Sequence, residues 1–138
     1  MTLPASDSLS KVFAVLSPAL TVSPVPVTPD VYQRLDADFD SFRGHVLISA
    51  FEFSAPWPMW ERHPAGDETV ILLDGDVTLT LRTAADQRVR LSAPGQFLIV
   101  PRDTWHTAVP HVATRMIFIT PGRGHGKHHF TDRLRAPA

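Results

Sequence analysis

The feature that most constrains the fold is a series of short apolar segments separated by proline, glycine and aspartate turns. From residue 46 to residue 120 these segments recur about every ten residues, a spacing typical of all-β sandwiches and barrels. In the segment 77–82, Val77, Leu79 and Leu81 alternate with polar residues. Alternation with a period of two places the apolar residues on one face of a strand. The sequence therefore predicts an all-β domain.

The pattern predicts strands over 46–53, 59–63, 68–73, 77–82, 89–91, 97–100, 105–109 and 115–120. Asp74, Gly75 and Asp76 predict a hairpin turn. Apolar residues three or four positions apart make residues 30–42 the candidate helix. We divide the chain into three parts: a proline-rich extended N-terminal arm with this short helix, packed on the barrel (1–43), the barrel itself (44–122), and a basic, histidine-rich tail (123–138).

Length and composition restrict the class of protein. The 138 residues fit one domain with its own core. Thirteen basic and 14 acidic residues give a net charge of -1, which argues against a nucleic-acid partner. The chain has no cysteine, so disulfides and thiolate metal ligands are excluded. The short apolar run after Lys11 lacks the features of a signal peptide, and we expect no membrane partner and a cytoplasmic protein.

Four residues form a candidate site for a divalent metal ion. Glu61 and His63 are two apart on an extended segment, so their side chains leave the same face. Glu68 follows a short loop and begins the next strand, and His106 begins a late strand. Imidazole and carboxylate groups are common ligands of divalent metals. Alternatively, Glu61 and Glu68 face solvent and His63 is an ordinary loop residue, and spacing alone does not decide between these.

Two motifs of this sequence resemble those of the cupins, in particular small bacterial single-domain cupins. The first motif of that family runs His-x-His, four residues, Glu, six residues, Gly, and here it reads Glu61-Arg62-His63-Pro64-Ala65-Gly66-Asp67-Glu68 followed by Gly75. The second motif is represented by Gly95, Pro101 and His106 at the family's spacing. The resemblance covers about residues 44 to 122. It implies a jelly-roll or double-stranded β-helix barrel that binds one divalent metal, with Fe, Mn, Ni and Zn as candidates.

The sequence departs from the family pattern at three positions. Asp103 replaces the second glycine of the second motif and Pro110 its final asparagine, changes that a turn can absorb. Glu61 replaces the first histidine of the first motif. Either Glu61 is a ligand, which gives two histidines and two carboxylates, or it turns away and leaves two histidines and one carboxylate with open positions. A third alternative is a degenerate site without metal.

Three functions remain open at this stage. The first is a metal-dependent enzyme, an isomerase, lyase or oxidoreductase acting on a small organic molecule, in which Glu61 or Glu68 moves a proton when it does not bind the metal. The second is a non-catalytic sensor or binding protein for a metal or small molecule, and the third is a metal-free structural cupin. Small cupins commonly pair, and the N-terminal arm could add a strand to a neighbouring chain, so we expect a homodimer.

An apolar wall around the metal would suit a ligand with apolar parts. Strand alternation predicts that this wall consists of Val70, Leu72, Phe97, Ile99 and Ala108. Asp67 is expected to stabilise its loop rather than to bind metal. Trp60, on the opposite face from Glu61, is expected in the core or at an interface. His125, His128 and His129 are assigned to the tail.

Overall fold

The structure is a computed structural model that describes residues 5–122 and the backbone of residues 132–135. It is built almost entirely of antiparallel strands, as the sequence predicts. The elements in chain order are β1 (Val12–Leu16), β2 (Val22–Pro26), α1 (Val31–Asp38), the 3₁₀ turn η1 (Asp40–Phe42), β3 (Val46–Phe53), β4 (Met59–Arg62), β5 (Glu68–Asp74), β6 (Val77–Leu81), β7 (Gln87–Leu91), β8 (Phe97–Val100), β9 (His106–Pro110), β10 (Thr114–Pro121) and β11 (Asp132–Arg135).

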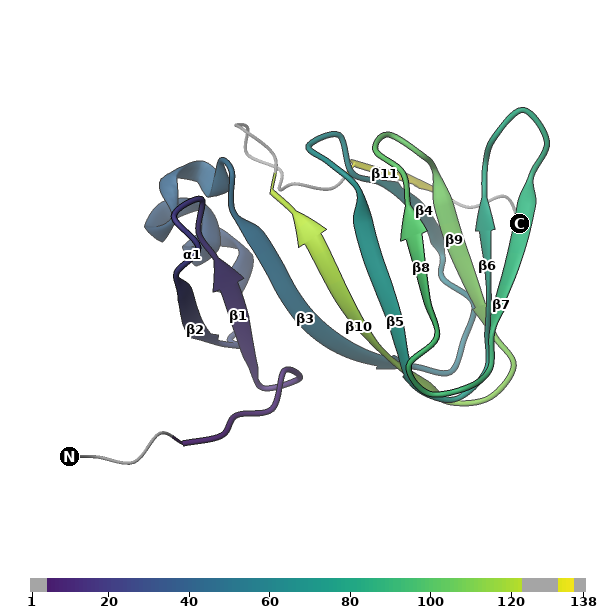
Figure 1. Cartoon of the computed structure of the whole chain (residues 1–138), viewed down its shortest axis with the longest axis horizontal. Helices are drawn as coiled ribbons and strands as arrows, with labels where there is room; N and C mark the ends of the chain where they lie inside the picture. Colours follow the sequence, from purple (N-terminus) through teal and green to yellow (C-terminus); the bar gives the residue numbers. More distant parts are fainter. Residues whose placement is uncertain (1–4, 123–131, 136–138) are drawn as a thin grey trace.

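The strands form two sheets (Figure 1). One has the order β2-β1-β3-β10-β5-β8 and the other has the order β11-β4-β9-β6-β7. The eight strands from β3 to β10 thus make two four-stranded layers, β3-β10-β5-β8 and β4-β9-β6-β7. This is the strand order of a jelly roll, in which the chain passes repeatedly from one sheet to the other. The predicted jelly-roll fold is confirmed.

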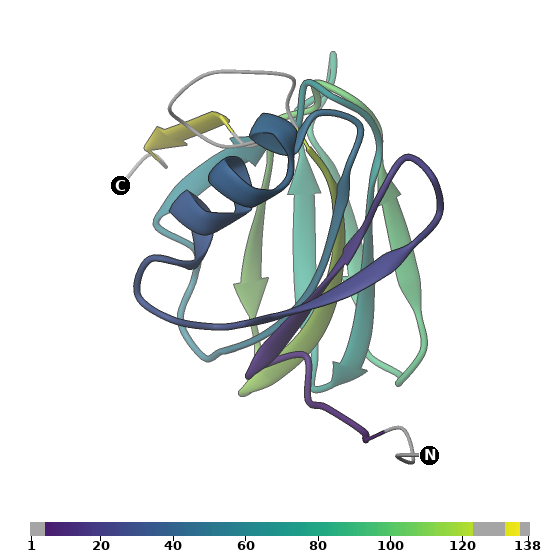
Figure 2. The same ribbon diagram turned by 90° about the vertical axis from the view of Figure 1, so that its left-hand side faces the viewer.

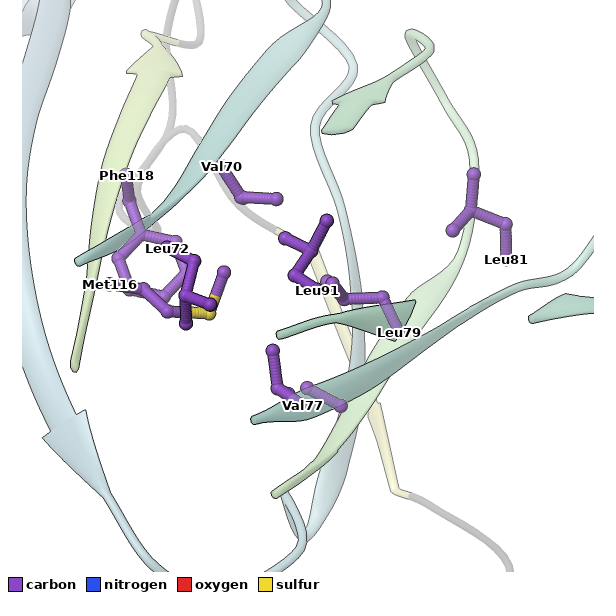
Figure 3. Packing of buried hydrophobic residues seen from close by; sticks show 9 residues of the cluster. Val70, Leu72, Val77, Leu79, Leu81, Leu91, Met116 and Phe118 are labelled. Carbon is purple, nitrogen blue, oxygen red and sulfur yellow. The ribbon is translucent and has the colours of Figure 1, made fainter. Parts of the chain in front are cut away.

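The first core lies between the two sheets. It consists of the inward-facing apolar residues that alternate along β5, β6 and β10, together with single residues of β7 and β9. Figure 3 shows side chains of β5 and β10 facing side chains of β6 and β7. Its buried members are Val70, Leu72, Val77, Leu79, Leu81, Leu91, Ala108, Met116 and Phe118.

A second core joins the N-terminal segment to the barrel. Here α1 places Val31 and Leu35 against Phe13 and Val15 of β1, so the helix covers this end of the six-stranded sheet (Figure 2). The helix lies within the predicted range 30–42 but ends at Asp38, and η1 follows with positive φ angles. The N-terminal segment is therefore folded onto the barrel rather than simply extended.

One expectation about strand pairing is wrong. Asp74, Gly75 and Asp76 do not form a hairpin turn, because β5 pairs with β10 and β8 whereas β6 pairs with β7 and β9. The turn instead carries the chain from one sheet to the other. β1 pairs with β2 on one side and with β3 on the other, so β2 is the strand of the N-terminal segment that lies at the edge of the six-stranded sheet. That this segment adds a strand to a neighbouring chain stays a prediction, as does the homodimer.

The C-terminal segment adds one strand that the sequence pattern did not predict. β11 pairs antiparallel with β4, and Arg133 is the register partner of Glu61. His125, His128 and His129 lie outside the described residues. Among the described residues, no helix combines the length and the apolar character needed to cross a membrane.

Candidate metal centre

Three of the four predicted ligands come from the five-stranded sheet. Glu61 lies on β4, and its register partner on β9 is His106. His63 follows one residue after the end of β4, two positions from Glu61, so the alternation of an extended chain turns both side chains to the same side. One ligand atom from each of Glu61, His63 and His106 lies within 4.8 Å of the others.

The fourth residue, Glu68, reaches the same point from the six-stranded sheet. It begins β5 and is 3% exposed. Its Oε2 atom lies 3.1 Å from His63 Nε2, and its Oε1 atom lies 3.2 Å from His106 Nε2. Thr120 on the neighbouring strand β10 donates a hydrogen bond from Oγ1 to Glu68 Oε2 at 2.7 Å. The structure thus groups Glu61 with His63 and His106, and it places Glu68 in contact with both histidines.

The ring of His106 is oriented so that Nε2 faces Glu68. Its Nδ1 atom lies 3.1 Å from the backbone oxygen of Thr104, and a carbonyl oxygen can only accept. Nδ1 is therefore the protonated nitrogen, and in the neutral ring Nε2 presents its lone pair to a carboxylate. Two acceptors face each other at 3.2 Å, a repulsive arrangement unless a proton or a metal ion lies between them.

The hydrogen-bonding state of these atoms fits a metal ion. His106 Nε2 and Glu68 Oε1 are buried without a hydrogen bond of acceptable geometry. Buried polar groups without partners cost about 1 to 3 kcal/mol each, so this pair of atoms needs an explanation. Ligands about 2.1 Å from a metal and at right angles to each other lie about 3 Å apart, close to the observed separations. The donor set therefore fits a divalent cation.

The electrostatics of Glu68 agree with its surroundings. Burial raises the pKa of its carboxyl, but in the metal-free protein the hydrogen bonds and the charge that His106 and His63 supply when their rings are protonated outweigh burial and lower the pKa from 4.5 to about 2. Glu68 is consequently ionised over the whole physiological range. A buried carboxylate that stays charged requires cationic or hydrogen-bonding partners, and it supplies the negative charge that a metal site needs.

Two loops hold the ligands in place. The loop after β4 and the loop before β9 are joined because Arg102 donates its backbone N–H to Asp67 Oδ1 and its guanidinium to Ala65 O. Asp67 therefore stabilises its loop, as predicted. Asp103, which stands where the cupin motif has glycine, has φ +60°, a conformation that aspartate adopts more readily than most residues.

The predicted apolar wall is only partly correct. Val70, Leu72 and Ala108 are fully buried in the first core, whereas Phe97 and Ile99 are 60% and 52% exposed. The two wrong assignments have a common cause, because all four residues of β8 are apolar and the pattern does not reveal which pair faces inward. Leu98 and Val100 do so. That Val70, Leu72 and Ala108 line a ligand pocket stays a prediction.

Besides the four candidate ligands, the residues next to the site include the aromatic residue Trp57, which flanks the first motif in the sequence, and two threonines that the sequence did not reveal. The ring of Trp57 lies 6.3 Å from that of His106 and also contacts Phe53 and Phe118, at 5.6 and 5.9 Å between ring centroids. Thr104 and Thr120 contact His106 and Glu68 as described above. The sequence does hold a signal for Thr120. The alternation of β10 places it on the same inward face as Phe118, where a polar residue is unexpected.

Comparisons with known proteins concern the fold. No family model and no curated protein matches the chain. A cupin-2 domain protein from Shewanella frigidimarina is 20% identical over 55% of this chain and 70% of that chain, with a TM-score of 0.48. A cupin superfamily protein from Desulfitobacterium hafniense is 28% identical over 55% of this chain and 66% of that one, with a TM-score of 0.47.

A structure of oxalate oxidase is also similar, with 14% identity and a TM-score of 0.46 over 54% of this chain. The match covers 40% of the oxalate oxidase chain. The strand order of the present chain is that of a jelly roll, and the residues of both cupin-like motifs lie on it.

Proposed function

We propose that the protein binds one divalent metal ion through His63, His106 and Glu68, with Glu61 as the fourth ligand. The observation that carries this proposal is the convergence of both Nε2 atoms on the two oxygens of one buried carboxylate. The hydrogen bond of His106 to Thr104 supports it, because it fixes the tautomer that a metal ligand requires.

We further propose that the bound metal serves an enzyme acting on a small organic molecule. A metal at this place would supply Lewis-acid or redox chemistry. Four protein ligands leave two positions free on a six-coordinate ion such as iron, manganese or nickel, but none on tetrahedral zinc. A native zinc ion would therefore favour the alternative, a sensor or binding protein. Whether the reaction is an isomerisation, a lyase reaction or an oxidation stays open.

The residues beside the metal indicate the character of the substrate. Trp57 packs edge-on against His106, and Phe53 and Phe118 pack against Trp57, so one side of the site is an aromatic wall. Glu61 is half-buried, and in the alternative in which it does not bind the metal it is the carboxylate that we assign to proton transfer. The proposed substrate combines a group that binds the metal with an apolar part. The cytoplasmic location stays a prediction.

Metal analysis of the full chain, purified without a nickel column, tests the metal proposal. We expect about one metal ion per chain, lost in His63→Ala and in His106→Ala because each removes one of the four proposed ligands. His111→Ala is the matched control, since His111 is exposed and contacts Thr78 on the outer surface. A second control replaces His125, His128 and His129 together. Metal that survives in His106→Ala but disappears in this triple variant would contradict the proposed site.

A further inference from the structure

A row of aromatic rings begins at the candidate ligand His106 and leads away from the metal centre. Next to His106 lies Trp57, and next to Trp57 lies Phe118 of β10, with ring centroids 6.3 and 5.9 Å apart. Phe118 in turn contacts Phe51 of β3 at 6.0 Å between centroids. Aromatic rings at such separations attract each other beyond the effect of burial. The aromatic wall beside the metal centre therefore extends across the inner face of the six-stranded sheet.

Phe51 is unusual because it points inward and is nevertheless exposed to solvent. Along β3 it alternates in step with Leu47 and Ser49, which are each 2% exposed, so its side chain leaves the inner face of the sheet. Phe51 itself is 44% exposed. Single exposed apolar residues are ordinary on an outer surface, but the inner face of a sheet is normally covered. Solvent therefore reaches the inner face at this point.

The N-terminal segment fixes the position of this exposed ring. β3 lies between β1 and β10 (Figure 1), and on the β1 side Phe51 makes a T-shaped contact with Phe13 at 5.8 Å. Phe13 is 1% exposed and contacts Tyr32 of α1 at 6.3 Å. Phe13 belongs to the second core and Phe118 to the first, so Phe51 lies where the two cores meet. A ring that is held between two buried rings is already ordered for binding.

The two rings that flank Phe118 are placed to hold a flat group between them. Phe118 is 8% exposed, whereas Phe51 and Trp57, which both contact it, are more accessible. The backbone N–H of Trp57 donates to Ala108 O at 3.0 Å, which ties this residue to β9. Centroids of paired aromatic rings lie about 4.5 to 7 Å apart. A ring that lies over Phe118 can therefore contact Phe51 on one side and Trp57 on the other.

The chemistry of the row selects an aromatic group. Its members carry no charge, so they offer nothing to an ionic group. The rings of Phe51, Phe118 and Trp57 meet each other at 60° and 43° between planes, and an added ring can adopt the same tilted arrangement, whereas an alkyl chain gains only from burial. We propose that Phe51 and Trp57 bind an aromatic ring of the substrate. This rests on the proposed metal-dependent function, and it defines the substrate class as a metal-binding group joined by a short linker to an aromatic ring.

The ring half of such a substrate is tested on the full chain without any metal. The probe is para-fluorobenzyl alcohol, observed by fluorine NMR in the presence of a chelator. We expect its signal to broaden with wild type, and we expect Phe51→Ala to weaken its binding about 5-fold or more, because the variant removes one of the two flanking rings. The matched control is Phe97→Ala, which removes a 60% exposed phenylalanine from the outer face of the same sheet and should leave binding unchanged.

The joined molecule is tested on metal-loaded protein by calorimetry. Phenylacetohydroxamate should bind wild type about 10-fold more tightly than acetohydroxamate, since both chelate a metal but only the first carries a ring. Phe51→Ala should remove most of this difference while metal content and acetohydroxamate binding stay unchanged. Phe51→Leu keeps an apolar side chain in contact with both cores, and it is the variant that decides the test if Phe51→Ala fails to fold.

The two measurements separate this proposal from that of the metal centre. A chain that binds the ring probe through Phe51 but retains no metal would contradict the metal centre and support the ring site. No broadening with wild type at millimolar probe, or equal binding by wild type and both Phe51 variants, would overturn the ring site whatever the metal content. A dimer that Phe51→Ala dissociates in sedimentation, together with no probe binding, would place a second chain against this ring and would also overturn the proposal.

Discussion

Replacing Thr120 by valine should weaken the site without removing any proposed ligand. Valine has nearly the shape of threonine, so the change removes the hydroxyl that donates to Glu68 Oε2 at 2.7 Å. Thr120 is 5% exposed and Glu68 is 3% exposed, and water has little access to replace the lost donor. A hydrogen bond to a charged group contributes about 1.5 to 3 kcal/mol. We therefore expect the metal-free variant to be about 2 kcal/mol less stable at neutral pH.

Urea unfolding in the presence of a chelator measures this difference. Thr80→Val on β6 is the matched control, because Thr80 lies on the outer face of the five-stranded sheet, away from Glu68. In a Glu68→Gln background, Thr120→Val should lower the free energy of unfolding by clearly less, because the charged acceptor is absent there. The difference between the two backgrounds isolates the contribution of this one hydrogen bond.

The metal affinity supplies the second half of the test. Residues that hold a ligand in position typically change the affinity 10-fold to 100-fold when they are replaced. Competition with a coloured chelator should therefore show at least about a tenfold loss for Thr120→Val and none for Thr80→Val. If Thr120→Val matches wild type in both stability and metal affinity, the hydroxyl does not support Glu68, and the reasoning from its buried contact is refuted.

Two further predictions concern the turn at Gly75 and the acid range. Gly75 has φ +113°, and an added Cβ would lie 2.5 Å from Thr114 Oγ1 and 2.7 Å from Thr114 Cα. Gly75→Ala should therefore lower the free energy of unfolding, measured in urea, by about 3 kcal/mol or more. Gly95→Ala should cost only about 1 to 2 kcal/mol, because its φ is +89° but its Cβ would meet open space; equal costs would contradict this reasoning. In the folded protein the pKa of Glu68 is lowered from 4.5 to about 2. Its ionised form therefore stabilises the metal-free protein above pH 4.5. This contribution of roughly 3 kcal/mol to the free energy of unfolding disappears as the pH falls towards 2. The stability difference between wild type and Glu68→Gln, measured from pH 5 to pH 2, should shrink accordingly, and a constant difference would argue against the lowered pKa.

The sequence predicted the proximity of the candidate residues better than it predicted the sheet pairing. Two motifs set where each of these residues begins or ends a strand, and in the structure Glu61, His63 and His106 form one group while Glu68 contacts both histidines. That these residues bind a metal stays a prediction. The turn at Asp74 could not be assigned from local chemistry, because a glycine turn serves equally well within a hairpin and between two sheets.

The inward face of β8 was misassigned for a different reason. Alternation identifies the buried side only where the other side is polar, as on β6, where threonines alternate with Val77, Leu79 and Leu81. On β8 both sides are apolar, so the pattern carries no information about direction. The other two residues of β8, Phe97 and Ile99, are exposed on the outer face of the six-stranded sheet.

The pairing of β11 with β4 has a thermodynamic consequence for metal binding. β11 is hydrogen-bonded to the strand that carries Glu61, and Arg133 is the register partner of that residue. Docking of β11 and binding of metal are thus two equilibria that act on one strand. If docking tightens metal binding by some factor, metal must favour docking by the same factor. Proteolysis or a fusion that prevents β11 from docking would then weaken metal binding. Bound metal would in turn slow hydrogen exchange along β11.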